Sequence, residues 1–141
     1  MIILDTSGLL AALDDTQIRH APAATALRAT QPPRFLSPFV LAELDYLLGS
    51  RVSRDTARRL LGEVADGAYQ LEPFEAADMQ RALEVIDQFA DHDIGIADAS
   101  VVVLAERHAT SDVLTLDERH FRVLRDRRGR PFRLLPGDSQ T

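Results

Sequence analysis

The sequence of 141 residues contains no cysteine, no lysine and no tryptophan. Without cysteine there can be no disulfide scaffold, no cysteine nucleophile and no thiolate zinc site. No apolar run approaches the roughly 18 residues that a transmembrane helix needs. The N-terminus, MIILDTSG, has no basic stretch and reaches an Asp at position 5, which is unlike a signal peptide. We therefore expect neither a membrane span nor a secretory leader, and a cytoplasmic location.

Charge is divided unevenly between the two signs. The chain has 22 acidic residues and 16 basic ones, all of them Arg, for a net charge of −6. A nucleic-acid-binding protein is expected to be basic, so this balance argues at first against such a partner. Arg binds phosphate through two parallel hydrogen bonds, but a GC-rich coding sequence is the simpler explanation for its exclusive use.

Length and composition predict one domain with one hydrophobic core. Hydrophobic residues make up 45% and charged residues 27% of the chain, as in an ordinary globular protein. We see no repeat and no linker. The prediction is a single domain over residues 1–136, followed by a disordered tail over 137–141, since chain ends fray unless they are held.

Short apolar runs alternate with longer helical segments. The pattern predicts strands at 2–4, 35–36, 69–71, 113–116 and 132–135. Helices are predicted at 14–29, 38–48, 54–66, 75–90 and 96–108, with a helical turn at 118–124. Strands that alternate with helices are typical of an α/β fold with a mostly parallel central sheet.

Two acids directly follow predicted strands. Asp5 comes after Ile2-Ile3-Leu4, and Asp117 comes after the segment 113–116. In open α/β sheets, ligands bind beyond the carboxyl ends of the strands, so both acids are candidate site residues. Thr6, Ser7 and Thr115 add hydroxyl groups beside them. The alternative is that each Asp only caps the helix that follows.

Two further acids lie among apolar neighbours in predicted helices. Glu43 has Phe39, Val40, Tyr46 and Leu47 on its helical face, and Asp98 lies in the segment IGIADASVVVLAERH. A carboxylate on an apolar face is costly unless it is paired or bound to a metal. Alternatives are an Arg partner for Glu43, a helix-dipole role for Asp98, and Asp45 as the buried acid of its helix.

Together the four acids predict a metal site. Carboxylates that converge repel one another and need a cation, and oxygen ligands suit Mg²⁺ or Mn²⁺. Two such ions about 3.5–4 Å apart can promote an in-line phosphodiester displacement. The four acids supply −4 of the net −6, so two divalent ions would leave about −2. The overall charge then no longer excludes a nucleic-acid substrate.

Four motifs resemble one known family. They are IILDTSGLLA at 2–11, SPFVLAELDYLL at 37–48, GIADASVVVLAERH at 95–108 and VLTLDERHF at 113–121. In this order and spacing they resemble the PIN-domain ribonucleases, and most closely the VapC-type toxins of bacterial toxin–antitoxin pairs. The motifs span almost the whole chain, and its compact length also matches.

The resemblance implies a three-layer α/β/α fold and an endoribonuclease that cuts structured RNA such as tRNA or ribosomal RNA. It implies that Asp5, Glu43, Asp98 and Asp117 hold Mg²⁺ or Mn²⁺, and that the Thr6 and Thr115 hydroxyls support them. It further implies a homodimer and inhibition by a small antitoxin protein. No Lys is available to contact RNA as in relatives.

Other residues have open interpretations. Seven Arg lie within fifteen residues, starting at Arg119, and either contact phosphate or form ion pairs with nearby acids: Arg119, Arg122, Arg125, Arg127, Arg128, Arg130 and Arg133. A second cluster on one predicted helix favours a solvated face or an antitoxin contact: Arg51, Arg54, Arg58 and Arg59. His120 either touches substrate, donates a proton, or has only a packing or capping role.

Other functional classes have weaker support. The sequence has no H-E-x-x-H, G-x-S-x-G, P-loop or G-x-G-x-x-G motif. An aspartyl-phosphate phosphatase would need a lysine near the phosphate, and none is present. Two alternatives to the toxin remain. One is a PIN-like module that binds RNA or protein without catalysis, and the other is a housekeeping PIN nuclease that has no antitoxin.

Overall fold

The computed structural model describes residues 1–139. The strands are β1 (Ile2–Leu4), β2 (Arg34–Leu36), β3 (Gln70–Leu71), β4 (Asp112–Leu114) and β5 (Arg133–Leu135). The α-helices are α1 (Thr6–Leu13), α2 (His20–Ala29), α3 (Pro38–Arg51), α4 (Arg54–Ala65), α5 (Ala76–Gln88), α6 (Ile96–Arg107) and α7 (Glu118–Phe121). A 3-10 helix, Ala90–His92, joins α5 to α6. None of these helices is long and apolar enough to cross a membrane.

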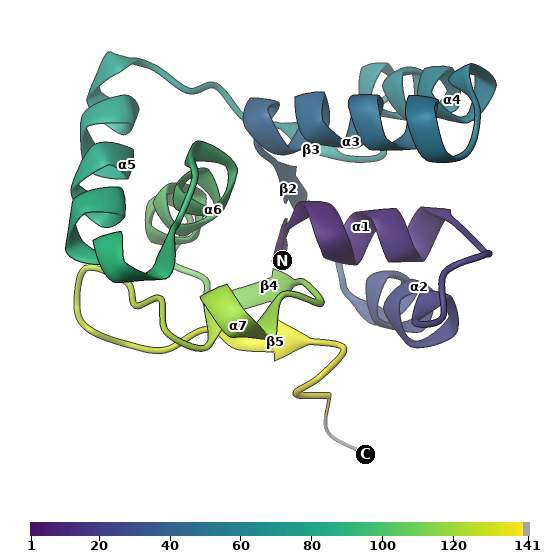
Figure 1. Ribbon diagram of the computed structural model, residues 1–141. Helices are drawn as coiled ribbons and strands as arrows, with labels where there is room; N and C mark the ends of the chain where they lie inside the picture. Colours follow the sequence, from purple (N-terminus) through teal and green to yellow (C-terminus); the bar gives the residue numbers. More distant parts are fainter. Residues whose placement is uncertain (140–141) are drawn as a thin grey trace.

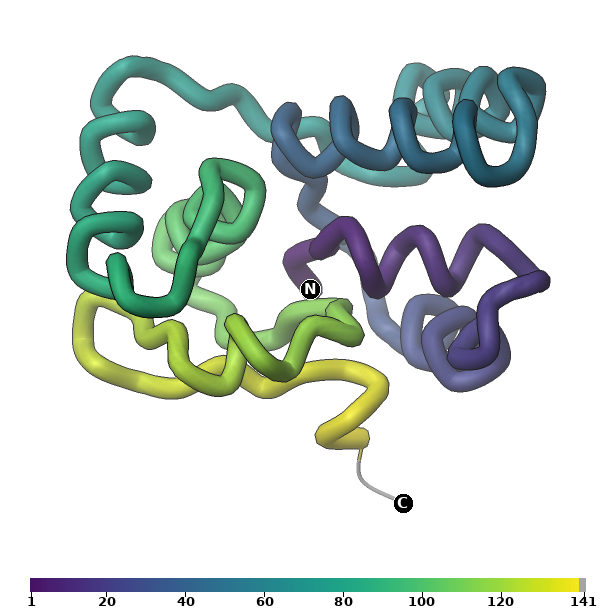
Figure 2. Tube along the Cα trace, viewed as in Figure 1, coloured from purple at the N-terminus to yellow at the C-terminus, as the bar shows by residue number. Residues whose placement is uncertain are grey.

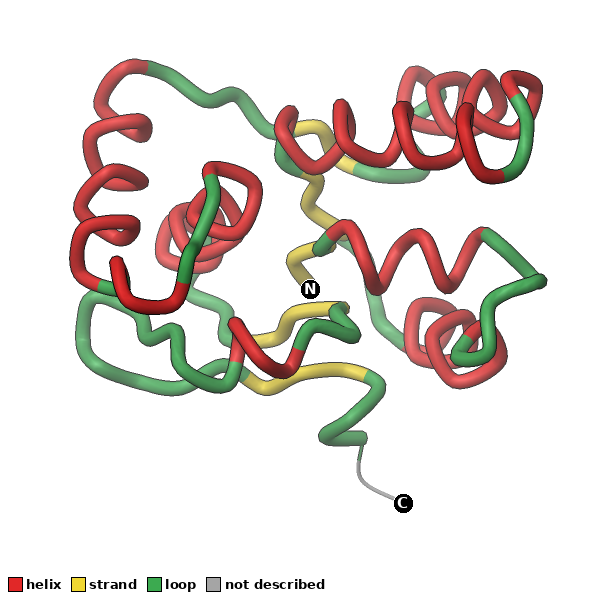
Figure 3. Tube along the Cα trace, viewed as in Figure 1, coloured by secondary structure: helices red, strands yellow, loops and turns green. Residues whose placement is uncertain are grey.

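The five strands form one parallel sheet in the order β3-β2-β1-β4-β5. Figure 3 shows the short strands at the centre, with helices around them. The central strand β1 pairs with β2 through Leu4↔Leu36 and with β4 through Leu4↔Leu114. All three residues of β1 are fully buried, as expected for a strand covered on both faces. The carboxyl ends of β1 and β4 are therefore neighbours.

The helices pack in consecutive pairs around the sheet: α1 with α2, α3 with α4, and α5 with α6. Figure 1 shows α5 and α6 on one side of the sheet and α1 and α2 on the other. The α6 segment from Ala99 to Ala105 is buried throughout, which explains its lack of a polar stripe. The predicted α/β/α fold with a parallel sheet is confirmed.

The predicted helix over 14–29 is correct only in its second part. Helix α2 covers His20–Ala29, whereas residues 14–19 form a turn in which Asp14 accepts hydrogen bonds from the Thr16 amide (3.0 Å) and hydroxyl (2.7 Å). Helix α1 precedes this range and was not predicted. The amphipathic pattern misses α1 because most of its residues are buried. Gly8 lets α1 approach β4 closely, since a Cβ there would lie 2.3 Å from the Leu114 carbonyl oxygen.

The other predicted elements are present with small differences at their ends. Ser37 caps α3 by accepting a hydrogen bond from the Phe39 amide (3.1 Å), and Pro38 follows it, as the sequence predicted. Figure 2 follows the backbone from β1 in the middle of the molecule to β5 at one edge. Beyond β5, within the predicted tail, Asp138 accepts a hydrogen bond from the Leu134 amide (2.8 Å) and pairs with Arg122 (2.7 Å). Residues 140 and 141 lie outside the described residues.

Candidate active site

Asp5 follows β1 and is almost completely buried, with 3% of its surface exposed. Its amide donates to the Leu114 carbonyl (3.0 Å), which continues the β1–β4 pairing. Its Oδ2 accepts hydrogen bonds from the Thr115 hydroxyl (2.7 Å) and the Ser7 hydroxyl (3.0 Å). Burial outweighs these hydrogen bonds and raises the pKa of Asp5 to about 6. The hydrogen bonds thus hold the carboxylate in one orientation, but they do not fully compensate the loss of hydration of its negative charge.

The Asp5 side chain has no capping hydrogen bond to α1, although Asp5 occupies the N-cap position. The capping alternative is therefore wrong for Asp5. Thr115 and Ser7 connect it instead to the segment after β4, because Thr115 Oγ1 accepts from the Asp117 amide and Ser7 Oγ from the Leu116 amide, both at 2.9 Å. The two hydroxyls thereby join the ends of β1 and β4.

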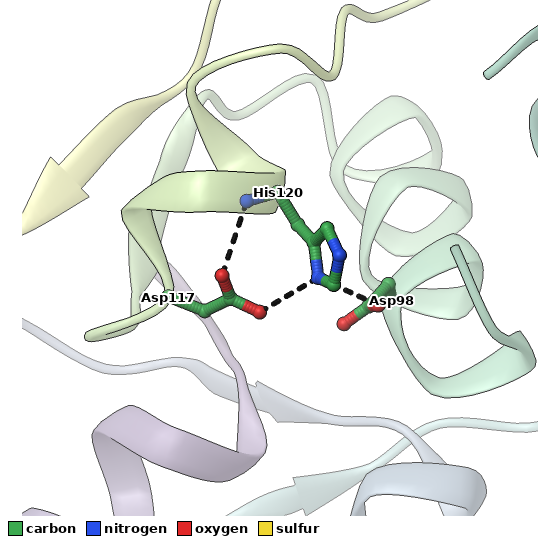
Figure 4. Close-up of side chains that lie close together, drawn as sticks. All are labelled: Asp98, Asp117 and His120. Carbon is green, nitrogen blue, oxygen red and sulfur yellow. Dashed lines mark hydrogen bonds and ion pairs between the residues drawn. The ribbon is translucent and has the colours of Figure 1, made fainter. Parts of the chain in front are cut away.

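Asp117 does cap the short helix α7. Its Oδ1 accepts a hydrogen bond from the His120 amide (3.0 Å), and its Oδ2 lies 2.9 Å from Nδ1 of the His120 ring. Figure 4 shows both contacts. The capping interpretation is correct for Asp117, but the cap also fixes the carboxylate next to the histidine. The Asp117 side chain therefore both caps α7 and lies at the candidate site.

Asp98 comes from the first turn of α6 and reaches the same place. Its Oδ2 lies 3.6 Å from His120 Nδ1, and 20% of the side chain is exposed. Burial raises the pKa of Asp98; the nearby His120 opposes this, and the negative charges of Asp117 and Glu43 add to it. Asp98 also raises the pKa of Asp5. These acids consequently interact although they come from separate parts of the sequence.

Glu43 was predicted to be buried on an apolar face, and that prediction is wrong: Glu43 is exposed. The apolar residues of α3 that face the core are Val40, Leu44 and Leu48, one position away from the face assigned from the sequence. Glu43 lies at an open pocket of about 480 Å³, whose walls include Asp98, Asp117 and His120. The alternative acid, Asp45, pairs with Arg54.

Thr6 differs from the other hydroxyl residues. It is buried, and its Oγ1 has no hydrogen-bond partner among residues 1–139. A buried hydroxyl without a partner is uncommon. The resemblance implied that Thr6 supports the site, and the structure places it directly after Asp5 with an unused donor and acceptor.

The arginines near the end of the chain differ in their contacts. Arg122, Arg130 and Arg133 form ion pairs with Asp138, Asp126 and Asp112, respectively. Arg127, Arg128 and Arg130 line a pocket with Glu106 at the end of α6, roughly 12 Å along the helix from Asp98. Arg119, in contrast, is exposed on α7 beside His120.

A pair of buried serines was not predicted. Ser100 of α6 donates to the Ala97 carbonyl (2.7 Å), and its hydroxyl lies 2.6 Å from that of Ser37, the cap of α3. Both residues are fully buried. The pair fixes the start of α3 relative to the turn of α6 that carries Asp98. The only signal in the sequence is one Ser inside the apolar run ASVVVLA.

The residues of the site fit a divalent cation. One ligand atom each of Asp98, Asp117 and His120 lies within 4.8 Å of the other two. Asp5 and Asp98 have raised pKa values, and no Arg forms an ion pair with either of them in the part of the chain that the structure describes. A group of acids without a cationic partner is stabilised by a bound metal ion.

Known proteins are similar to this chain over most of its length. The family model of the PIN domain matches residues 2–126. Ribonuclease VapC26 of Mycobacterium tuberculosis is 42% identical over 135 residues, which cover 96% of this chain and all of the relative.

Two solved structures share the fold. VapC20 of M. tuberculosis, described as a sarcin-ricin loop cleaving toxin, matches with a TM-score of 0.77 and 20% identity over 83% of this chain and 90% of its own. FitAcB from Neisseria gonorrhoeae matches with a TM-score of 0.55 and 19% identity over 77% and 83%. The continuous PIN match and the full-length likeness to a VapC ribonuclease agree with the arrangement of acids after β1, in α6 and after β4. The chain therefore belongs to the PIN-domain family and is a ribonuclease of the VapC type.

Proposed function

We propose that this ribonuclease is a Mg²⁺- or Mn²⁺-dependent endoribonuclease that acts as the toxin of a toxin–antitoxin pair. The observation that carries the proposal is the meeting of Asp98 and Asp117 in one open pocket, with Glu43 also in its wall. Asp5 completes the set, since its carboxylate interacts with that of Asp98. The VapC26 likeness supports the same reaction class.

Asp5, Glu43, Asp98 and Asp117 are the residues that would hold the metal. When bound, a divalent ion supplies positive charge that lowers the pKa of water and stabilises negative charge on the phosphate. The chain itself provides orientation: Thr115 and Ser7 hold Oδ2 of Asp5, and the α7 amide holds Oδ1 of Asp117. In the proposed hydrolysis, water attacks phosphorus in line with the 3′ oxygen. The bond to that oxygen breaks and leaves a 3′-hydroxyl and a 5′-phosphate.

The proposed substrate is structured RNA, either tRNA or ribosomal RNA, in the cytoplasm. VapC20, which shares the fold, is described as cleaving the sarcin-ricin loop. Arg119 is exposed beside the pocket wall, and we propose that it contacts an RNA phosphate.

The proposed protein partners are a small antitoxin and a second copy of the chain. Large apolar side chains of α3 and α5 are exposed, among them Tyr46 by 71%, Leu83 by 56% and Met79 by 43%. Met79 and Leu83 lie four positions apart on α5 and so share one exposed helix face, and contiguous exposed apolar side chains are typical of interfaces. Sedimentation that gives only monomer at micromolar concentration would remove the homodimer from the proposal.

The test is cleavage of a pool of small and ribosomal RNA by the pure protein in Mg²⁺ or Mn²⁺, with sequencing of the new ends. Glu43→Gln is compared with Asp45→Asn, because both acids lie on α3 but Asp45 pairs with Arg54 away from the pocket lining. We expect discrete 5′-phosphate ends with wild type and Asp45→Asn, and their loss with Glu43→Gln and with chelator. Wild type that yields no ends with any metal would favour a non-catalytic binding module.

A further inference from the structure

His120 is held toward the acids of the site by the short helix that carries it. Its amide donates to Oδ1 of Asp117 at 3.0 Å, which closes the first turn of α7. The same residue then turns its ring back, so that Nδ1 lies 2.9 Å from Oδ2 of Asp117 (Figure 4). The backbone contact and the ring contact together restrict the histidine to one side of the carboxylate.

The ring nitrogen also faces α6. His120 Nδ1 lies 3.6 Å from Oδ2 of Asp98, and two of the dashed lines in Figure 4, one to each Asp, meet at this nitrogen. The three ligand atoms lie within 4.8 Å of one another. Two ligands on opposite sides of one small divalent ion are separated by roughly 4–4.4 Å, twice a bond of about 2.0–2.2 Å. Small side-chain shifts therefore bring all three atoms to coordination distance.

The three side chains are accessible, unlike Asp5. Their exposed fractions are 20% for Asp98, 31% for Asp117 and 21% for His120, and all three line the open pocket. Asp5 is buried, and its Oδ2 is already occupied by two hydroxyl groups. The part of the site that an ion from solvent meets thus offers the His120 nitrogen and the Asp98 and Asp117 carboxylates, with the Glu43 carboxylate also in the pocket wall.

We propose that Nδ1 of His120 is a direct ligand of the metal ion, together with Asp98 and Asp117. This inference rests on the proposed metal dependence of the ribonuclease and adds a nitrogen to its four acids. The consequence is metal selectivity. Imidazole nitrogen suits transition metals, whereas Mg²⁺ is held through oxygen. The chain should therefore bind Mn²⁺ more tightly than Mg²⁺ because of His120.

The competing role for His120 is to orient Asp117 by a hydrogen bond without touching the metal. His120→Asn separates the two roles, since the Asn amide keeps an N–H donor near the position of Nδ1 but has no nitrogen lone pair for a metal. His92→Asn is the matched control, because His92 is exposed in the 3-10 helix between α5 and α6 and is not among the pocket residues.

The experiment uses the full chain with Mn²⁺ and pulsed electron paramagnetic resonance, which detects nitrogen bonded to the ion. We expect a ¹⁴N coupling in wild type that changes to a ¹⁵N coupling when histidine is ¹⁵N-labelled. The coupling should persist in His92→Asn and disappear in His120→Asn with Mn²⁺ still bound. Calorimetry should show Mn²⁺ affinity reduced at least about tenfold in His120→Asn, with Mg²⁺ affinity changed much less.

The outcomes separate this inference from the proposed function. Bound Mn²⁺ and RNA cleavage without a histidine coupling in wild type would overturn the ligand assignment and leave the nuclease proposal intact. A coupling that survives in His120→Asn would also overturn it. Failure of wild type to bind Mn²⁺ or Mg²⁺ at all would instead overturn the metal dependence, and the ligand assignment with it.

Discussion

The acids between α5 and α6 are paired with Arg side chains, whereas the acids of the candidate site form no ion pair with Arg among residues 1–139. Between those helices, Glu106 forms a two-pronged pair with Arg81 (2.8 and 2.9 Å), and Arg107 pairs with Asp78 (3.0 Å). Glu72 accepts from His108 and from Gln70 (3.1 Å). At the site, Asp5 and Asp98 have raised pKa values, and among residues 1–139 the one basic side chain within ion-pair distance of the Asp98 and Asp117 carboxylates is His120.

This difference distinguishes acids that are paired with Arg from the acids of the candidate site, which are not. The chain has 16 Arg available, and it places two of them against the acids of α5 and α6 but none in an ion pair with Asp5, Asp98 or Asp117 among residues 1–139. In an ion pair the negative charge of the acid is already compensated by the Arg. Acids without such a partner have their charge compensated only when a cation binds. The predictions below test that distinction.

The largest effect is expected from Asp98→Asn. The substitution removes one charge from the pocket, so RNA cleavage should fall at least about a hundredfold, the size typical of losing one group that stabilises transition-state charge. Mn²⁺ at 100 times its Kd should stabilise wild type by about 2.7 kcal/mol and this variant much less. Cleavage assays and thermal melts with and without Mn²⁺ measure both. Unchanged cleavage would contradict the site.

Asp5→Asn should stabilise the metal-free protein. The pKa of Asp5 rises from 3.8 to about 6 on folding, so the folded state binds a proton more tightly than the unfolded state. Stability therefore decreases as pH rises through the range from about 4 to 6. At 1.36 kcal/mol per unit, Asn should recover as much as about 3 kcal/mol at pH 7 and almost nothing at pH 3.5. Denaturant unfolding in chelator across this range is the measurement, and equal gains at both pH values would contradict the argument.

Glu72→Gln should have the opposite effect. Burial, which raises the pKa of Glu72, is outweighed by the hydrogen bonds from His108 and Gln70, and the pKa is lowered. The ionised Glu72 carboxylate therefore stabilises the folded state at pH values above its pKa in the unfolded chain, about 4.5. This stabilisation is lost as the pH falls below that value. We expect a loss of about 2 kcal/mol at pH 7 with cleavage per folded molecule unchanged. Asp55→Asn, an exposed pair with Arg59, is the control and should change stability by less than about 0.5 kcal/mol.

The smallest effect is expected from Arg119→Ala. Arg119 is exposed, and removal of one phosphate contact should reduce the salt dependence of RNA binding by about one unit of slope. Arg133→Ala, whose guanidinium pairs with Asp112 at 3.1 Å, should leave the slope unchanged. Each substitution is added to Asp98→Asn, so that the RNA is bound but not cleaved. RNA binding of the two double variants and of Asp98→Asn alone is then measured at several salt concentrations. Equal slopes for all three proteins would rule out Arg119 as a phosphate contact.

Much of the fold was predictable because local patterns carry it. The apolar runs at β1 and β4 and the Ser37-Pro38 start of α3 gave the right elements. Helix α1 was not predictable from amphipathicity, because it is buried on most sides and depends on Gly8 against β4. The exposure of Glu43 was also missed. Apolar residues surround it in sequence, and only the packing of α3 decides which of them face the core.

The sequence by itself determined that Asp5 and Asp117 follow strands and that the four motifs belong to a PIN-type ribonuclease. The tertiary structure decided which groups meet. Parallel pairing of β1 with β4 brings Asp5 to Thr115 across 110 positions of sequence, and the packing of α6 brings Asp98 to the ring of His120. It also decided which arginines are paired. Residue type and periodicity are local properties, whereas charge compensation depends on contacts between segments that are distant in the chain.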